Sequence, residues 1–143
     1  MKVIGFNFKK ISSERIEITE RPSINTNIEF TEIDKEKVDL LKEMESLRVE
    51  FKCSWVYSAP EKKDSPKQGE ISFEGSVILA VEKEESKEIL KAWKKKKLSP
   101  NFQAGLFNLI LRRCTSKAVF LAEEIALPSP LPLPKIKLQT NNN

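Results

Sequence analysis

Residue types that carry out catalysis are scarce in this sequence, and those present do not occur at catalytic spacings. The 143-residue chain has no histidine, which removes the commonest general base and zinc ligand. Its two cysteines, Cys53 and Cys114, are far apart in the chain, and two thiolates alone do not complete a zinc site. Each lies in an apolar pattern, so we interpret both as small buried hydrophobic residues. With no phosphate-binding GxxxxGK[ST] motif either, we expect a protein that is not an enzyme and needs no metal or cofactor.

A basic cluster, Lys94–Lys97, follows Trp93, and the chain has a net charge of +4 and a pI of about 9.0. Lysines bind phosphates and a neighbouring indole can stack on a base, so a nucleic-acid-binding module is one interpretation. The alternative is a helix over Glu84–Lys97 with acidic residues at its start and lysines at its end, as the helix dipole favours. Lysine is abundant along the whole chain, and both interpretations stay open from the residues alone.

The segment Ser99–Leu127 has more apolar residues than a helix on one face of a small domain requires. Ser99-Pro100 is a typical helix start, and apolar residues then recur three or four apart. One stripe contains Phe107, Ile110, Cys114, Ala118, Leu121 and Ile125. Because apolar residues extend beyond this stripe, we expect another copy of the chain to cover them, in a dimer or a tetramer with this helix at its centre. The expected interface residues are Phe102, Leu106, Leu109, Ile110 and Arg113.

Four segments alternate apolar and polar residues, which is the pattern of half-buried strands. They lie within Lys2–Ile11, Ile24–Phe30, Leu47–Tyr57 and Glu70–Glu82, and Gly75 in the last segment is a candidate β-bulge. Four strands with one apolar face each predict an antiparallel sheet. The expected fold class is therefore α+β: a four-stranded antiparallel sheet with one short and one long C-terminal helix packed on it.

Two further segments are apolar without the pattern of a strand. The connection Asp34–Ser46 predicts a short helix on the core, a crossover between sheet positions or a mobile apolar loop available to ligands. Its apolar residues are Val38, Leu40, Leu41 and Met44. After the long helix, Leu127–Ile136 is rich in leucine and proline and must be extended. We expect residues 1–138 to form a single domain and residues 139–143 to be disordered.

The cellular location follows from two negative observations. The sequence has no apolar run of about 18 residues, so no membrane-spanning helix is predicted. Its first ten residues lack the apolar centre of a signal peptide. We therefore expect a cytoplasmic protein.

Three short segments resemble motifs of the SecB family of protein-export chaperones, and the resemblance of pattern covers nearly the whole chain. Lys10–Glu14 (KISSE) is similar to the acidic motif that follows the family's first strand. Ser99–Phe102 (SPNF) is similar to the start of the family's long helix. Ile125–Leu133 (IALPSPLPL) is similar to the Phe-Pro-x-Leu-x-Leu-x-Pro segment that follows that helix.

This resemblance implies a function as well as a fold. SecB-like chains form a dimer of dimers with the long helices between two sheets, and they hold unfolded or pre-export polypeptides without ATP. Adaptable apolar grooves suit this task because many sequences then bind by burying area rather than by matched hydrogen bonds. The family's grooves lie beside the crossover loop and the C-terminal region. The implied client-binding residues are Val38, Leu40, Leu41, Met44, Leu131 and Leu133.

The chain departs from the family where SecB proteins dock on the translocase motor ATPase. SecB proteins are acidic, whereas this chain has a net charge of +4. Lys10 stands where the family's motif has aspartate, Glu14 is retained, and Ser76 stands at the position of a motor-contacting glutamate. We also expect the family's last helix to be missing. Besides clients, the resemblance implies two candidate partners, the translocase motor and an antitoxin of the kind that some SecB-like proteins protect.

Overall fold

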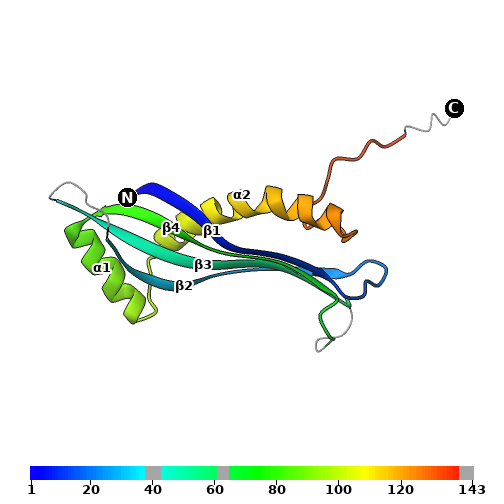
Figure 1. The fold of residues 1–143 in the computed structure, drawn as a ribbon, viewed down its shortest axis with the longest axis horizontal. Coiled ribbons are helices and arrows are strands. Elements are labelled where there is room, and N and C mark those ends of the chain that lie inside the picture. The colour runs from blue at the N-terminus through cyan, green and yellow to red at the C-terminus, as the bar shows by residue number, and fades with distance from the viewer. Residues whose placement is uncertain (38–42, 61–64, 139–143) are drawn as a thin grey trace.

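Four long strands followed by two helices make up the chain, and the computed structural model describes residues 1–37, 43–60 and 65–138. Every pair of neighbouring strands is antiparallel, in the order β1-β4-β3-β2. The predicted α+β fold, with a short and a long helix after the sheet, is confirmed (Figure 1). The elements are β1 (Lys2–Arg15), β2 (Ser23–Glu36), β3 (Met44–Ser58), β4 (Gly69–Glu82), α1 (Lys83–Lys94) and α2 (Pro100–Glu124).

The order of the strands corrects one prediction. Because β2 pairs with β3 up to Glu36 opposite Ser46, the connection between these strands joins neighbours and is not a crossover. The strands also extend into the expected connection, so that Met44 is the first residue of β3. The three apolar residues Val38, Leu40 and Leu41 lie outside the described residues. It is the 16–22 segment that takes the chain from one edge of the sheet, β1, to the other edge, β2.

The core lies on one face of the sheet and is built mainly by the two central strands. Alternate residues of β3 and β4 are fully buried, as the period of two predicts. They are Leu47, Val49, Phe51, Cys53, Trp55, Tyr57, Ile71, Phe73, Val77, Leu79 and Val81. Ile89 of α1 and the inner stripe of α2 join the same cluster, so both helices cover the apolar face. Charged residues such as Arg48 and Glu50 lie on the opposite face, where they form an ion pair.

The inner stripe of α2 differs from the predicted one by a rotation of the helix. Its buried residues recur every four positions, and they are Leu106, Ile110, Cys114, Ala118 and Ala122. Phe107, Leu121 and Ile125, which were expected in this stripe, are half-buried at its borders. Small alanine and cysteine side chains face the sheet because they let the helix backbone lie close to it.

The interpretation of both cysteines as buried residues is confirmed, since neither thiol has exposed surface. Cys114 of α2 faces Cys53 of β3 across the helix–sheet contact, and their thiols hydrogen-bond to each other. This bond and burial raise the pKa of the Cys114 thiol far above its usual range. A thiol that stays protonated is a poor nucleophile, so Cys114 acts here as a packing residue.

Gly75 in β4 is needed for close approach of β1, rather than for a bulge in its own strand. The register of β1 against β4 shifts between Phe8 and Lys10, so the irregularity lies in β1, opposite Gly75. A Cβ atom at position 75 would overlap the backbone oxygen of Asn7 and would come within 2.9 Å of the Phe51 ring. Only glycine fits between these two neighbours.

The end of α2 is fixed to the sheet at what we call the Tyr57 end, where β3 ends and β4 begins. The phenol of Tyr57 donates a hydrogen bond to the backbone oxygen of Pro128 at 2.5 Å. Arg15 donates one to the backbone oxygen of Ala126 at 3.2 Å, and Leu127 is buried. Beyond this anchor, residues 129–138 run away from the body (Figure 1). The opposite end, where β3 begins and α1 lies, is called the Met44 end.

Deprotonation of Tyr57 is expected to destabilise the fold at alkaline pH. Burial raises the pKa of this phenol to about 12, from about 10 in an unfolded chain. The contribution of the protonated phenol to the free energy of unfolding is therefore fully present below pH 10. It is lost as the pH rises from 10 to 12, which lowers the free energy of unfolding by up to about 2.7 kcal/mol. Urea unfolding at pH 9, 10 and 11 measures this loss. Tyr57→Phe should show a flatter dependence on pH, and parallel curves for the two proteins would contradict the prediction.

Glycine is expected to stabilise the protein at position 126. Ala126 has a φ of 55°, and Leu127 N–H donates to Ala122 O at 2.8 Å, which is the bonding of a Schellman helix end. An L-residue costs about 1–2 kcal/mol in this left-handed conformation, so Ala126→Gly should raise the free energy of unfolding by about 1 kcal/mol. Urea unfolding tests this. The matched control Ala104→Gly, on the exposed side of α2, should lower stability by about the same amount.

Candidate functional site

An open groove of about 800 Å³ lies between the edge strand β2 and the two helices, and we call it the β2 groove. Strand β2 contributes Ile28 and Phe30, and α2 contributes Phe107. The rings of Phe30 and Phe107 are 4.5 Å apart between centroids, and that of Phe102 is 6.4 Å from Phe30. The remaining lining residues are Glu29, Thr31, Trp93, Lys94, Lys96, Leu98 and Gln103. The groove is thus an aromatic surface with charged and polar groups along it.

The position of β2 explains why these side chains remain accessible. The alternation of β2 turns Ile28 and Phe30 toward the core face, but β2 is the last strand on its side of the sheet. Ile28 and Phe30 are therefore less covered than the inward-facing residues of the central strand β3, and both are half-buried. One side of the β2 backbone also has no neighbouring strand. An edge strand of this length is a ready template for pairing with an extended peptide.

The basic cluster lies at the rim of this groove and ends α1. The helix stops at Lys94, Lys96 takes a left-handed φ of 54°, and Lys97 N–H donates to Ala92 O at 2.9 Å. The lysines therefore stand where the helix dipole favours positive charge. Trp93 is half-buried against the core and lines the groove. This geometry is that of a helix terminus next to an apolar groove.

The residues predicted to bind clients are not brought together by the described structure. Met44 is half-buried at the Met44 end of the sheet. Leu131 and Leu133 are 43% and 52% exposed and follow the anchor at the Tyr57 end. The 15 residues of β3 separate these ends by about 50 Å. The groove residues Phe30 and Phe107 were not singled out as binding residues from the sequence, and Trp93 was considered only as a residue that could stack on a nucleic-acid base.

Of the predicted interface residues, Leu106 and Ile110 are better described as core. Both have at most 1% exposed surface and pack against the chain's own sheet, so neither offers surface to a partner. Phe102 and Leu109 are half-buried. Arg113 is exposed, and its guanidinium lies 5.3 Å from the centre of the Phe6 ring.

Exposed apolar residues of β1 and α2 meet at a second apolar surface, beside Phe120. Phe120 is 60% exposed, and it lines a hollow of about 330 Å³ with Ile11 and Leu121. Val3 and Ile4 at the start of β1 are also exposed. Strand β1 is the other edge of the sheet, so this apolar surface adjoins a second unpaired strand edge.

The described ranges contain neither a cluster of metal ligands nor a membrane-spanning helix. No group of three or more histidine, cysteine, aspartate or glutamate residues placed to hold a metal ion is found there. In the same residues, no helix is both long enough and apolar enough to cross a bilayer.

Four antiparallel strands followed by a short and a long helix define this chain as SecB-like in fold. Among solved structures it is similar to Rv1957, the SecB-like chaperone of Mycobacterium tuberculosis, solved in complex with a ChAD peptide from the Rv1956 HigA1 antitoxin. The TM-score is 0.53 with 14% sequence identity, over 97% of this chain and 92% of that chain. At this identity the likeness is one of fold. No family model matches the sequence, and no curated protein sequence matches it significantly.

Proposed function

We propose that this protein is an ATP-independent chaperone that holds unfolded polypeptide in the β2 groove. The observation that carries the proposal is the group of half-buried aromatic rings, Phe30, Trp93 and Phe107, along an unpaired strand edge. The SecB-like fold supports it, because the similar Mycobacterium tuberculosis protein is a chaperone bound to a peptide.

The groove offers an extended client two kinds of contact. Backbone groups of the client can pair with the free edge of β2, which gives affinity without sequence preference. Its apolar side chains can then pack on the aromatic rings, which adapt to many partners because burial is not directional. The lysines at the rim, Lys94 and Lys96, favour clients that carry acidic residues beside the apolar ones.

The client surface that we propose extends beyond the groove. Met44 is half-buried, and its flexible side chain suits varied ligands. Val38, Leu40 and Leu41, in the connection beside it, remain part of the proposal, as do Leu131 and Leu133 of the C-terminal segment. The candidate clients are pre-export polypeptides and an antitoxin. If the clients are pre-export polypeptides, we further propose that the protein docks on a translocase motor. We expect the protein to act in the cytoplasm.

An aggregation assay tests the proposed function. A chemically denatured enzyme is diluted into buffer with an equal or double molar amount of this protein and without ATP, and light scattering follows aggregation. Suppression of scattering, together with recovery of a soluble complex, supports the proposal. Unchanged aggregation of several unrelated clients, with tight and salt-dependent binding of an oligonucleotide, would instead favour a nucleic-acid-binding module that uses Lys94–Lys97.

We further propose that the chain assembles as a dimer or a dimer of dimers through α2 and predict the effect of a charge there. Multi-angle light scattering at micromolar concentration should give a multiple of the 16.4 kDa chain mass. Leu109→Glu should shift the mass toward 16.4 kDa, because a carboxylate buried in an apolar contact costs several kcal/mol. Asn108→Glu, on an exposed position next to it, is the control and should leave assembly intact. A mass of one chain for the unmodified protein across a tenfold dilution would contradict the proposal.

A further inference from the structure

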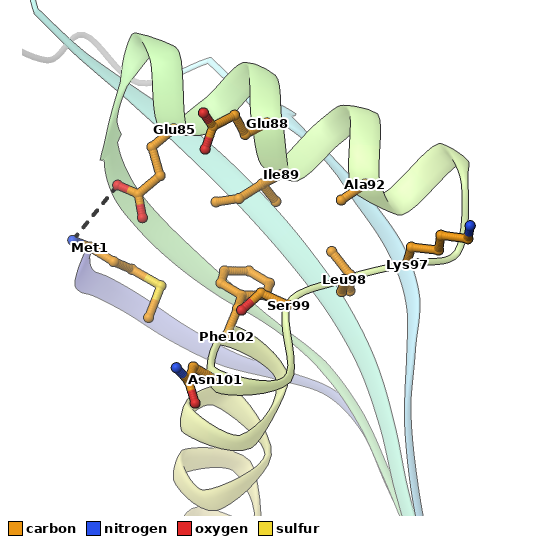
Figure 2. A pocket seen from close by; sticks show the side chains of 10 residues that line it. All are labelled: Met1, Glu85, Glu88, Ile89, Ala92, Lys97, Leu98, Ser99, Asn101 and Phe102. Carbon is orange, nitrogen blue, oxygen red and sulfur yellow. Dashed lines mark ion pairs between the residues drawn. The ribbon is translucent and has the colours of Figure 1, made fainter.

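A separate hollow of about 540 Å³ lies between α1 and the first turn of α2 (Figure 2), and we call it the α1–α2 hollow. Ile89, Leu98 and Phe102 form an apolar floor, and the ring of Phe102 points into the space. Leu98 also lines the β2 groove, but the other floor residues do not. The hollow therefore offers apolar contacts that the proposed client site does not use.

The charge around the α1–α2 hollow is uneven. The carboxylates of Glu85 and Glu88 lie together at one end, whereas Lys97 lies at the other (Figure 2). The amino group of Met1 is 4.0 Å from Glu85, and Glu88 has no cationic partner within the ranges that the structure describes. An occupant with apolar side chains followed by positive charges would complement this arrangement.

The chain itself contains a segment of that composition, residues 131–138, which we call the Leu/Pro tail. Four large apolar residues are exposed, namely Leu131 at 43%, Leu133 at 52%, Ile136 at 98% and Leu138 at 93%. Pro132 and Pro134 within the tail, and Pro130 before it, hold the segment extended, so that little conformational entropy is lost when it binds. Lys135 and Lys137 alternate with the last two apolar residues. Such a series of exposed apolar side chains marks a segment that binds.

We propose that the Leu/Pro tail of one copy docks in the α1–α2 hollow of a second copy. Its apolar side chains would cover Ile89 and Phe102, and its lysines would lie beside Glu85 and Glu88. The other open apolar sites have fewer carboxylates for the lysines of the tail: the β2 groove has one, Glu29, beside two lysines, and the hollow beside Phe120 has Lys117 and no carboxylate. The proposal does not depend on client binding in the β2 groove, but a docked tail would no longer offer Leu131 and Leu133 to a client.

The length of the tail shows why the hollow must belong to another copy. The tail leaves the fold at Pro128, which Tyr57 binds at the C-terminal end of α2. The hollow lies at the N-terminal end of this 25-residue helix, about 37 Å away. At about 3.1 Å per residue, Ile136 reaches only about 25 Å from Pro128 and Leu138 about 31 Å, so neither reaches the hollow of its own chain. If the α2 helices of two chains lie antiparallel, the C-terminal end of each helix lies beside the N-terminal end of the other. The tail of each chain can then dock in the hollow of its partner, which gives a closed two-fold dimer.

Cross-linking between two differently tagged full-length chains tests the proposal directly. One chain carries Glu88→Cys and the other Lys135→Cys, while the buried Cys53 and Cys114 stay unmodified. Mixing them with a short bis-maleimide should give a product that carries both tags. The control replaces Lys135→Cys by Lys52→Cys, on the outer sheet face, and should give none. Absence of the mixed product, or cross-linking only within a chain that carries both cysteines, would overturn the proposal.

A second measurement removes the two kinds of contact in turn. Leu133→Ser with Ile136→Ser should raise the dimer dissociation constant at least about tenfold by sedimentation. Glu85→Gln with Glu88→Gln should weaken it mainly at low salt, since ion pairs at an exposed rim are screened. The control, Glu14→Gln with Glu17→Gln, removes two exposed carboxylates from the other end of the sheet. Equal dissociation constants for all four folded proteins would overturn the proposal.

Discussion

Replacing Phe30 and Phe107 together by serine is expected to weaken binding of an unfolded client by about 30-fold to 1,000-fold. The two rings lie 4.5 Å apart and form the centre of the β2 groove. Each is half-buried, so each offers a client part of its apolar area, worth about 1–2 kcal/mol. The sum of about 2–4 kcal/mol corresponds to the stated loss, at 1.4 kcal/mol for each factor of ten. Fluorescence anisotropy with a labelled unfolded peptide measures it.

The control changes two apolar residues elsewhere that are more exposed than Phe30 and Phe107. Ile11→Ser with Phe120→Ser removes the exposed surface beside β1 and should leave the affinity for the peptide unchanged. Circular dichroism and urea unfolding establish that both double variants fold. If the Phe30 and Phe107 variant keeps full affinity while the control loses it, the client surface lies beside β1, and the assignment of the β2 groove is wrong.

Alanine at position 75 is expected to lower the free energy of unfolding by about 3 kcal/mol. The added methyl group meets a backbone oxygen of β1, which cannot rotate away, and the edge of the Phe51 ring at 2.9 Å. Overpacking of this kind costs about 1–3 kcal/mol, and the rigid backbone neighbour puts Gly75→Ala at the upper end. Since small domains are stable by only about 5–15 kcal/mol, the loss should be evident in a urea titration.

Gly105 provides the opposite result from the same substitution. It lies in α2 with nothing within 4 Å of the position of an added Cβ, so Gly105→Ala should raise stability by about 1 kcal/mol through helix propensity. The two alanine variants thus differ in sign because of their surroundings. Equal effects at positions 75 and 105 would show that β1 does not approach β4 as closely as described.

The elements were predictable from the sequence where one periodicity runs without interruption. Central strands such as β3 are covered on both sides by neighbours, so their alternation continues from Leu47 to Tyr57. The edge strands are less regular. In β2, a register shift between Phe30 and Glu32 changes which residues face inward, so that Ile33 is buried although it breaks the alternation of Ile28 and Phe30. No residue type at this position allows the register shift to be predicted from the sequence.

The candidate site was harder to predict because it depends on topology. Phe30, Trp93 and Phe107 lie in three different elements, and only the order β1-β4-β3-β2 leaves β2 uncovered beside the ends of both helices. Aromatic residues in a strand indicate a core until the strand is known to be an edge. The excess of apolar residues in α2 was a sound signal, but the rotation of the helix decides which of them face the sheet. That rotation assigns Leu106 and Ile110 to the core.

The pairing of β1 with β4 has a consequence for how the chain folds as it is made. Lys2 pairs with Ala80 and Arg15 with Gly69, so the first strand to be synthesised finds its partner only after β2 and β3 have followed. At about 5–20 residues per second, β1 waits for several seconds with Phe6 and Phe8 uncovered. The β3–β4 hairpin closes a much shorter loop and forms without this delay. While it is being synthesised, the chain is therefore partly unfolded with aromatic side chains exposed. This is the state of a polypeptide that a chaperone of the proposed kind would bind.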